Sequence, residues 1–236
     1  MTNNNIAETL TTTLELEHPP VALAFVDEPP EGIPVIDHEA ASWCTLWRKA
    51  ETGQFFAPPA GHYNCPVGAM VTGFEMPPSV QRELETVVHR MCNSAYIDLK
   101  EPENIPVTNR AKGGIIYGPL QESSFKPDAV ILWLTPRQAM FCSEAMGGCQ
   151  WTANMKTLAL GRPACAAIPM TLGNSAHTLS FGCIGMRTYT EIRDDYILAV
   201  LSFDRVESLL TSLRVTMLAN NQMLEYYREN KNRFPA

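Results

Sequence analysis

Residues 128–134, DAVILWL, decide the fold class because six consecutive apolar residues follow one aspartate. An apolar run of this length, bounded by turn-forming residues, is typical of a strand that is buried on both faces of a sheet. Pro136 then begins the segment 136–146, for which we predict a helix, since proline is favoured in the first helical turn. This strand–helix step predicts a sheet that is covered by helices.

Two other segments, VALAFV at 21–26 and YILAVL at 196–201, have the same continuous apolar pattern and predict two more buried strands. We also predict helices at 6–17, 38–50, 79–91 and 203–230 and just after Pro66, and strands at 114–118, 163–169 and 177–181. The fold class is therefore α/β (mixed α+β), with a mixed β-sheet flanked by helices and a long C-terminal helix. No linker or repeat divides the chain, so we expect residues 1–236 to form a single domain.

The overall composition excludes several classes of function. The chain has 236 residues, of which 45% are hydrophobic and 18% charged, and its net charge of −7 disfavours binding to nucleic acid. The N-terminal stretch MTNNNIAETLTTTLELEH has no basic segment followed by an apolar one, and no window approaches the roughly 18 apolar residues of a membrane span. We expect a cytoplasmic protein that binds neither nucleic acid nor a membrane.

Cysteines carry the strongest chemical pattern. Seven thiols in a reducing compartment are core residues, metal ligands or reactive groups rather than disulfides. Cys65 lies in NCPVG (64–68), where a Cys-Pro step precedes a helix start and Gly68. Cysteine followed by proline is common among iron–sulfur ligands, and a helix start lowers a thiol pKa. The alternative is a thiol packed under a turn.

Cys183 lies in FGCIGMR (181–187), between two glycines and before an arginine. Gly182 and Gly185 would let backbone N–H groups approach a sulfur, and Arg187 would stabilise a thiolate. The alternative is a tight turn with a buried thiol and a surface arginine.

The other cysteines are less informative. Cys44 lies between two tryptophans on a predicted helix, and a core thiol is the simpler interpretation. Cys142 and Cys149 are seven residues apart, which is not the short C-x₂-C spacing of a zinc knuckle. Cys92 and Cys165 fit core positions.

Four segments give the chain a resemblance to the domain of unknown function 169 family of archaea and bacteria, from about residue 14 to about residue 227. They are HPPVALAF (18–25), NCPVGAMVTGF (64–74), FKPDAVILWLTPRQAM (125–140), and GRPACAAIP with LSFGCIGMRTYTEIRDDYILAVL (161–169 and 179–201). The resemblance implies no activity, but it implies that Cys44, Cys65 and Cys183 occupy family cysteine positions, with Cys165 similar to a fourth. Related sequences tend to read Cys-Gln-Ala from the first of these positions, where this chain has Cys44-Thr45-Leu46.

The leading hypothesis is a cysteine-ligated metal or iron–sulfur cluster with a redox or accessory role. Its metal ligands are Cys44, Cys65, Cys183 and Cys165, with Gly68, Gly182, Gly185 and Arg187 around the cofactor. Thiolates select soft or borderline metals, so an iron–sulfur cluster comes first, and zinc or thiolate-ligated haem are alternatives.

Two alternatives need no metal. One is a binding protein for a small anionic or aromatic metabolite, with Arg187 as the anion anchor and a pocket lined by Trp43, Trp47, Tyr63, Phe74 and Met70. The other is a thiol-dependent enzyme that uses Cys65 or Cys183 as nucleophile and His62 as base. The expected partners are a small molecule or a redox protein, and the apolar stripe in 203–230 suits a homodimer as well as the core.

Overall fold

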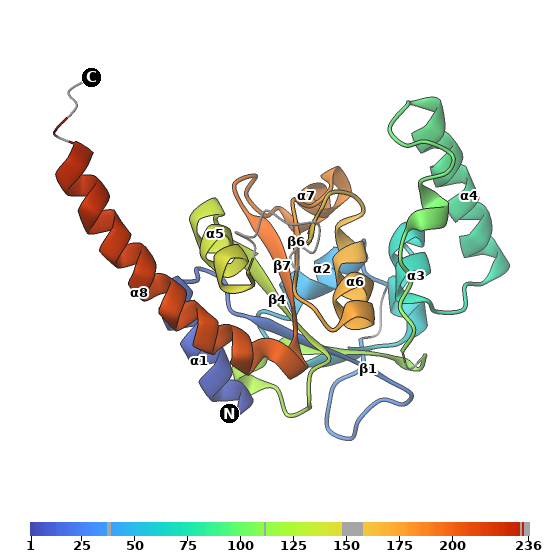
Figure 1. Cartoon of the computed structure of the whole chain (residues 1–236). Helices are drawn as coiled ribbons and strands as arrows, with labels where there is room; N and C mark the ends of the chain where they lie inside the picture. Colours follow the sequence, from blue (N-terminus) through green and yellow to red (C-terminus); the bar gives the residue numbers. More distant parts are fainter. Residues whose placement is uncertain (37–38, 111, 148–157, 232, 234–236) are drawn as a thin grey trace.

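The computed structural model describes residues 1–36, 39–110, 112–147, 158–231 and 233. These residues contain one seven-stranded sheet with the strand order β2-β3-β1-β4-β7-β6-β5 (Figure 1). All neighbouring pairs are antiparallel except the edge pair β5–β6, which is parallel, so the predicted mixed sheet is confirmed. The strands are β1 (Val21–Val26), β2 (Phe55–Ala57), β3 (Gly114–Pro119), β4 (Ala129–Leu134), β5 (Leu158–Leu160), β6 (Thr178–Ser180) and β7 (Ile197–Ser202).

The three strongest predicted strands lie side by side at the centre of the sheet. β4 is paired with β1, where Val21 faces Ile131, and with β7, where Leu132 faces Ala199. Every residue of β4 is buried, as its unbroken apolar sequence requires of a strand covered on both faces.

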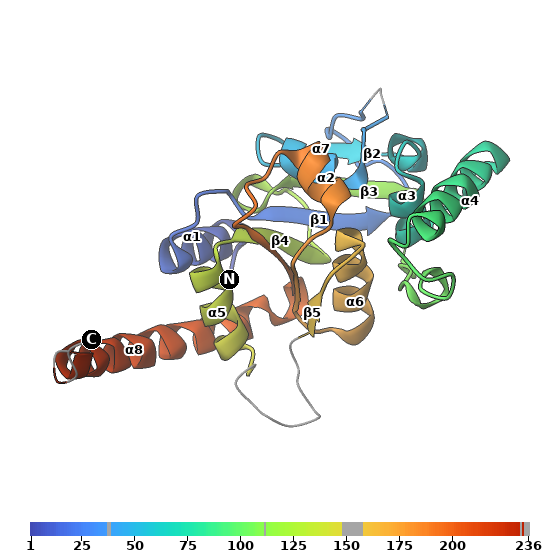
Figure 2. The same cartoon turned by 90° about the horizontal axis from the view of Figure 1, so that it is seen from above.

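Helices cover both faces of the sheet (Figures 1 and 2). On one face, α1 (Asn3–Leu14), α5 (Pro136–Ala145) and α8 (Val206–Lys231) pack on side chains such as Val130 and Leu132. On the other face, α2 (Trp43–Lys49), α3 (Pro66–Thr72), α6 (Ala167–Asn174) and α7 (Ile184–Thr190) pack on side chains such as Ile131 and Trp133. The alternation follows from the two-residue period of a strand. No helix among the described residues is long and apolar enough to cross a membrane.

Two predicted elements are wrong. The segment 163–169 is not a strand but the 3-10 turn Ala164–Ala166 followed by α6. It joins β5 to β6, and because these strands are parallel, their connection must cross over the sheet, which a helix does. The helix predicted at 38–50 begins only at Trp43, with Ser42 as its N-cap. Residues 37–38 lie outside the described part of the chain.

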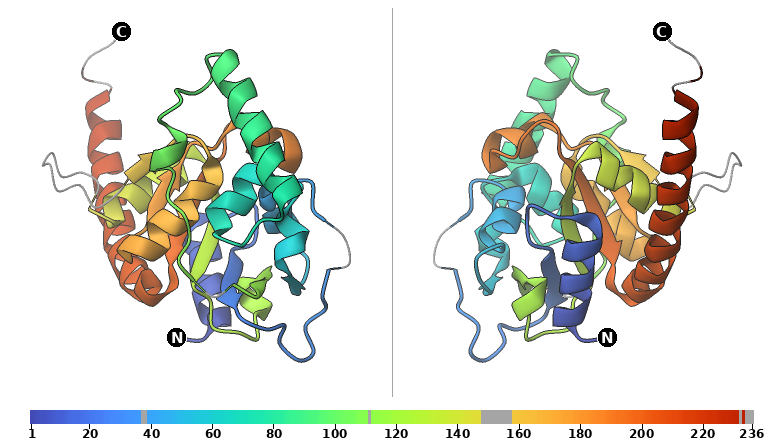
Figure 3. Two further views of the ribbon diagram at one scale, coloured as in Figure 1. Left: turned by 90° about the vertical axis from the view of Figure 1, so that its right-hand side faces the viewer. Right: turned by 90° about the vertical axis from the view of Figure 1, so that its left-hand side faces the viewer.

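The helix predicted at 79–91 is α4 (Pro78–Asn93), but Ser79 lies inside it rather than at its N-cap, because Pro77 and Pro78 already begin the helix. α4 contacts α3 and projects away from the sheet layers (Figures 1 and 3). Its single buried residue in the described structure is Val80, so most of its apolar face is free of the core.

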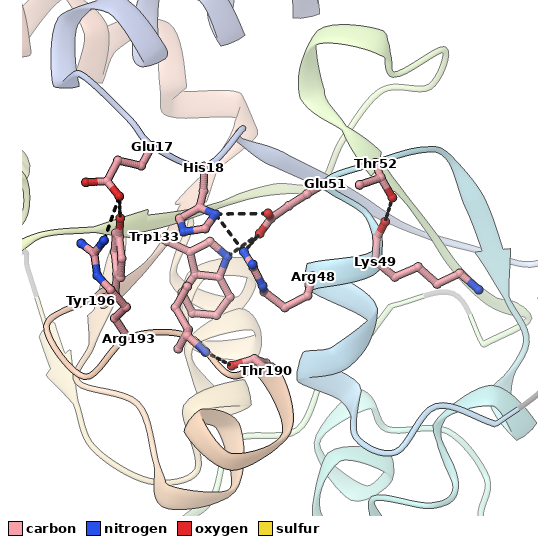
Figure 4. Close-up of polar contacts among 11 residues, drawn as sticks. Glu17, His18, Arg48, Lys49, Glu51, Thr52, Trp133, Thr190, Arg193 and Tyr196 are labelled. Atoms are coloured by element: carbon pink, nitrogen blue, oxygen red, sulfur yellow. Dashed lines mark hydrogen bonds and ion pairs between the residues drawn. The ribbon is translucent and has the colours of Figure 1, made fainter.

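A half-buried polar cluster joins α2 to the sheet (Figure 4). The Glu51 carboxylate accepts a hydrogen bond from Trp133 Nε1 at 3.0 Å and forms an ion pair with Arg48. His18 Nδ1 lies 3.2 Å from the same carboxylate and 2.9 Å from the Arg48 guanidinium. Because only 10% of the Glu51 side chain is exposed, these partners replace water around its charge.

We expect Glu51→Ala to lower the free energy of unfolding by about 1–3 kcal/mol, since the Trp133 N–H and the Arg48 charge lose their acceptor. Glu51→Gln keeps an oxygen for the indole N–H and should lose less. Urea denaturation measures both, with Glu8→Ala on the exposed side of α1 as control. Equal losses for the alanine and glutamine variants would show that the indole contact contributes nothing.

Candidate functional site

Four cysteines line one cavity. The cavity has a volume of about 770 Å³ and lies between α3, α4, α7 and the segments 96–106 and 161–166. All four predicted ligands face it: Cys44, Cys65, Cys165 and Cys183. They come from α2, from the residue before α3, from the 3-10 turn before α6 and from the residue before α7. Segments that are far apart in the sequence therefore bring four thiols to one place.

Burial controls the ionisation of these thiols. It raises the pKa of Cys44 well above its ordinary value, and the nearby sulfurs of Cys165, Cys183 and Cys65 raise it further. The pKa of Cys165 is raised for the same reasons, with burial again the largest cause. Burial also raises the pKa of Cys65, against the opposing effect of the Gly68 backbone N–H. These three thiols are protonated and unreactive at neutral pH while no cation neutralises their charge.

The backbone fits closely around Cys65. Pro66 is the first residue of α3, and Cys65 is its N-cap, as the Cys-Pro step predicts. A Cβ added to Gly68 would lie 3.0 Å from the Cys65 sulfur and 3.1 Å from the Trp43 Cβ. Glycine therefore allows a sulfur-to-backbone approach that a larger residue would obstruct.

Cys183 is the N-cap of a helix that the sequence did not predict. Its sulfur accepts a hydrogen bond from the Met186 N–H at 3.4 Å, at the start of α7. Gly182 adopts the left-handed conformation, with φ +82°, which turns the chain into the cap. Gly185 has no atom within 4 Å of an added Cβ, so a larger residue would fit there without a steric clash.

The sulfurs as placed do not form a ready metal site. Within the part of the chain that the structure describes, no three His, Cys, Asp or Glu side chains are grouped so that they could hold a metal ion. The four cysteines share a cavity and influence each other's pKa, but a common ligand would require their side chains to rotate toward it.

Arg187 binds the backbone rather than the cavity. Its guanidinium donates hydrogen bonds to the carbonyl oxygens of Phe181 at 2.8 Å and of Arg193 and Tyr196 at 3.1 Å. It also lies 3.7 Å from the Asp194 carboxylate, and it does not line the cavity. These contacts fix the chain around α7, whereas the sequence pattern predicted that the guanidinium would balance thiolate charge.

His62 is fully buried, and both of its ring nitrogens have partners. Trp43 Nε1 donates to the Tyr117 hydroxyl at 2.6 Å, and that hydroxyl lies 2.9 Å from His62 Nε2. His62 Nδ1 lies 3.0 Å from the Pro58 carbonyl oxygen. The network assigns the proton to Nδ1 and makes Nε2 an acceptor. Burial lowers the pKa of His62 to about 4, and its ring does not line the cavity as an acid or base would.

The predicted aromatic pocket is wrong in most of its residues. Trp43, Trp47 and Phe74 are buried in the hydrophobic core, and the Tyr63 hydroxyl donates to the Glu75 carbonyl oxygen at 2.8 Å. Only Met70 of the predicted set lines the cavity. The cavity is also lined by an apolar stripe of α4, which was not among the predicted residues although it has the i, i+3, i+4, i+7 spacing of one helix face: Leu84, Val87, Val88 and Met91.

The remaining cysteines lie elsewhere. Cys142 packs in the core between the sheet and α8, and burial raises its pKa to about 12. Cys149 lies outside the described residues, so the structure does not test the Cys142–Cys149 spacing. Cys92 is on α4 and does not line the cavity.

Comparison with known proteins gives a family but no activity. The family model of the domain of unknown function 169, described as uncharacterised ArCR, matches residues 9–212. No curated protein and no solved structure matches the chain. The matched range includes all four cavity cysteines and ends within α8.

Proposed function

This chain belongs to the domain of unknown function 169 family, and we propose that it binds an iron–sulfur cluster through Cys44, Cys65, Cys165 and Cys183 and acts as a redox or accessory protein. One observation carries the proposal, namely that four thiols from four separate segments line a single cavity. The buried core of the other sheet face holds only one cysteine among the described residues, Cys142.

The chemistry of the four thiols favours a cation as their common ligand. Protonated thiols with raised pKa values are poor nucleophiles, which argues against a thiol enzyme based on Cys65. A soft metal ion or cluster iron deprotonates a coordinating thiol outright, so binding would release protons and strengthen as the pH rises. Cluster iron also matches sulfur ligands, and a cluster among apolar side chains is protected from water.

Two features of the cavity suit a cluster in particular. Cys65 and Cys183 are half-buried, which leaves a route for iron and sulfide to enter, whereas Cys44 and Cys165 are about 5–6% exposed and form the floor. The approach of Gly68 to the Cys65 sulfur places a backbone N–H group nearby, and hydrogen bonds to sulfur tune cluster potentials.

The test is anaerobic purification or reconstitution with iron and sulfide, followed by elemental analysis and visible absorption. We expect a brown protein with stoichiometric iron and acid-labile sulfide. Cys65→Ser and Cys183→Ser, at the two half-buried positions, should retain at least about tenfold less iron, because they remove direct ligands. Cys142→Ser, a buried cysteine on the opposite sheet face, is the matched control and should keep its iron.

Circular dichroism and thermal melting of each variant separate loss of iron from loss of folding. Colourless protein with stoichiometric zinc would keep the thiolate site but reject the cluster, and a Soret band after haem addition would identify haem instead. Folded protein that retains no iron, zinc or haem after reconstitution would reject the metal site altogether.

A further inference from the structure

The cavity is much larger than the cysteine cluster at its floor. Its volume of about 770 Å³ falls in the range of roughly 300–1,000 Å³ found for small-molecule sites. Six segments of the chain line it, and the thiols come from α2, the residue before α3, the 3-10 turn before α6 and the residue before α7. The remaining space lies along α4.

The wall on the α4 side is apolar and is not used by the core. Leu84, Val87, Val88 and Met91 lie at the spacing of one helix face and are all half-buried. A soluble helix normally packs such a stripe on the core, but α4 packs little of it on the protein. The stripe faces the cavity, where Met70 and Met170 continue the apolar surface on the other side. Methionine side chains adapt readily to the shape of a ligand.

The charges around the cavity do not favour an anion. Among the described lining residues the charged ones are Glu83, Glu101 and Arg162. Arg162 already lies 3.3 Å from both Glu101 carboxylate oxygens, and its guanidinium stacks on the Tyr96 ring at 4.5 Å. The lining therefore has no unpaired positive charge, which counts against the anionic metabolite expected from the sequence.

We propose that this cavity binds an uncharged, largely apolar organic molecule between α4 and the thiols, with any polar group of the molecule directed to the rim formed by Arg162, Glu101 and Tyr96. The proposal stands on the cavity and the α4 stripe. Only one part of it rests on the proposed function: the inner end of the molecule would contact a cluster held by the four cysteines.

The experiment titrates the reduced, metal-free 236-residue chain with the neutral probe N-phenyl-1-naphthylamine and follows the fluorescence of the probe. We expect saturable enhancement at one probe per chain. Val87→Asp should weaken binding at least tenfold, because it adds a carboxylate to the apolar wall. Thr86→Asp is the matched control, since it adds the same charge one residue away on the exposed side of α4 and should leave binding unchanged.

A second control separates the cavity from the exposed apolar part of α8, where Leu218 is 62% exposed. Leu218→Asp should not change probe binding, and a loss there would locate the probe on α8 and overturn the proposal. Absence of saturable binding, or equal binding by the Val87→Asp and Thr86→Asp variants, would also overturn it. Unsubstituted protein that binds the probe saturably but retains no iron after reconstitution fails the proposed function alone.

Discussion

Trp43→Ala is expected to lower the free energy of unfolding by about 3–5 kcal/mol, as large-to-small substitutions of buried aromatic residues do. The Trp43 side chain is completely buried and packs edge-on against Trp47 with ring centroids 5.8 Å apart. Its indole N–H donates to the Tyr117 hydroxyl at 2.6 Å. Alanine leaves a cavity under α2 and leaves that hydroxyl without its donor. Cys44 is the next residue of α2, so the substitution should also make the position of the Cys44 thiol in the cysteine-lined cavity less well defined.

The contribution of the hydrogen bond can be measured separately with phenylalanine. Trp43→Phe keeps most of the apolar volume but removes the donor to Tyr117. Trp47→Phe is the matched comparison, because the Trp47 indole N–H is buried without a partner among the described residues. Chemical denaturation should show a smaller loss for Trp47→Phe than for Trp43→Phe. Equal losses would mean that the Trp43–Tyr117–His62 chain of hydrogen bonds adds no stability.

Acidification from pH 6.5 to pH 4 is expected to destabilise the protein by about 3 kcal/mol for each of two histidines, the buried His62 and the half-buried His177. Burial lowers the pKa of His62 to about 4, and burial together with the Arg205 charge lowers that of His177 to about 4. Between pH 6.5 and pH 4, the unfolded chain binds protons at the His62 and His177 rings, whereas the folded chain does not. The unfolded state thus carries more protons, so stability falls as the pH falls.

The contacts of the two rings explain why the folded state resists protonation. His177 Nδ1 accepts the Ser202 N–H at 3.2 Å, and His62 Nε2 accepts the Tyr117 hydroxyl. A proton on either nitrogen would replace an acceptor with a second donor and break that hydrogen bond.

Urea denaturation between pH 7 and pH 4 tests this expectation. The His62→Gln and His177→Asn variants should each flatten the pH dependence of the unfolding free energy by about half. His89→Gln, at an exposed position on α4, is the control and should leave the slope unchanged. A slope that survives in the double variant would assign acid sensitivity to groups other than these two rings.

The sequence by itself determined the central sheet and much of its cover. The runs at 21–26, 128–134 and 196–201 are apolar at every or nearly every position, which is typical of strands covered on both faces. The helices beginning at Pro66 and Pro136 were also predictable, because proline suits the first helical turn. The family resemblance of the sequence further singled out the four cysteines that line the cavity.

Tertiary structure alone decided the rest. The segment 163–169 is part of a helical crossover because β5 and β6 are parallel. The local sequence does not show whether two strands pair in parallel or antiparallel. The turn around α7 gave Arg187 three backbone carbonyl partners, and the packing of β3 placed the Tyr117 hydroxyl on His62, so neither side chain lines the cavity. The α4 stripe has the spacing of a core-facing helix, yet it lines a cavity, because periodicity fixes which face is apolar but not what that face meets.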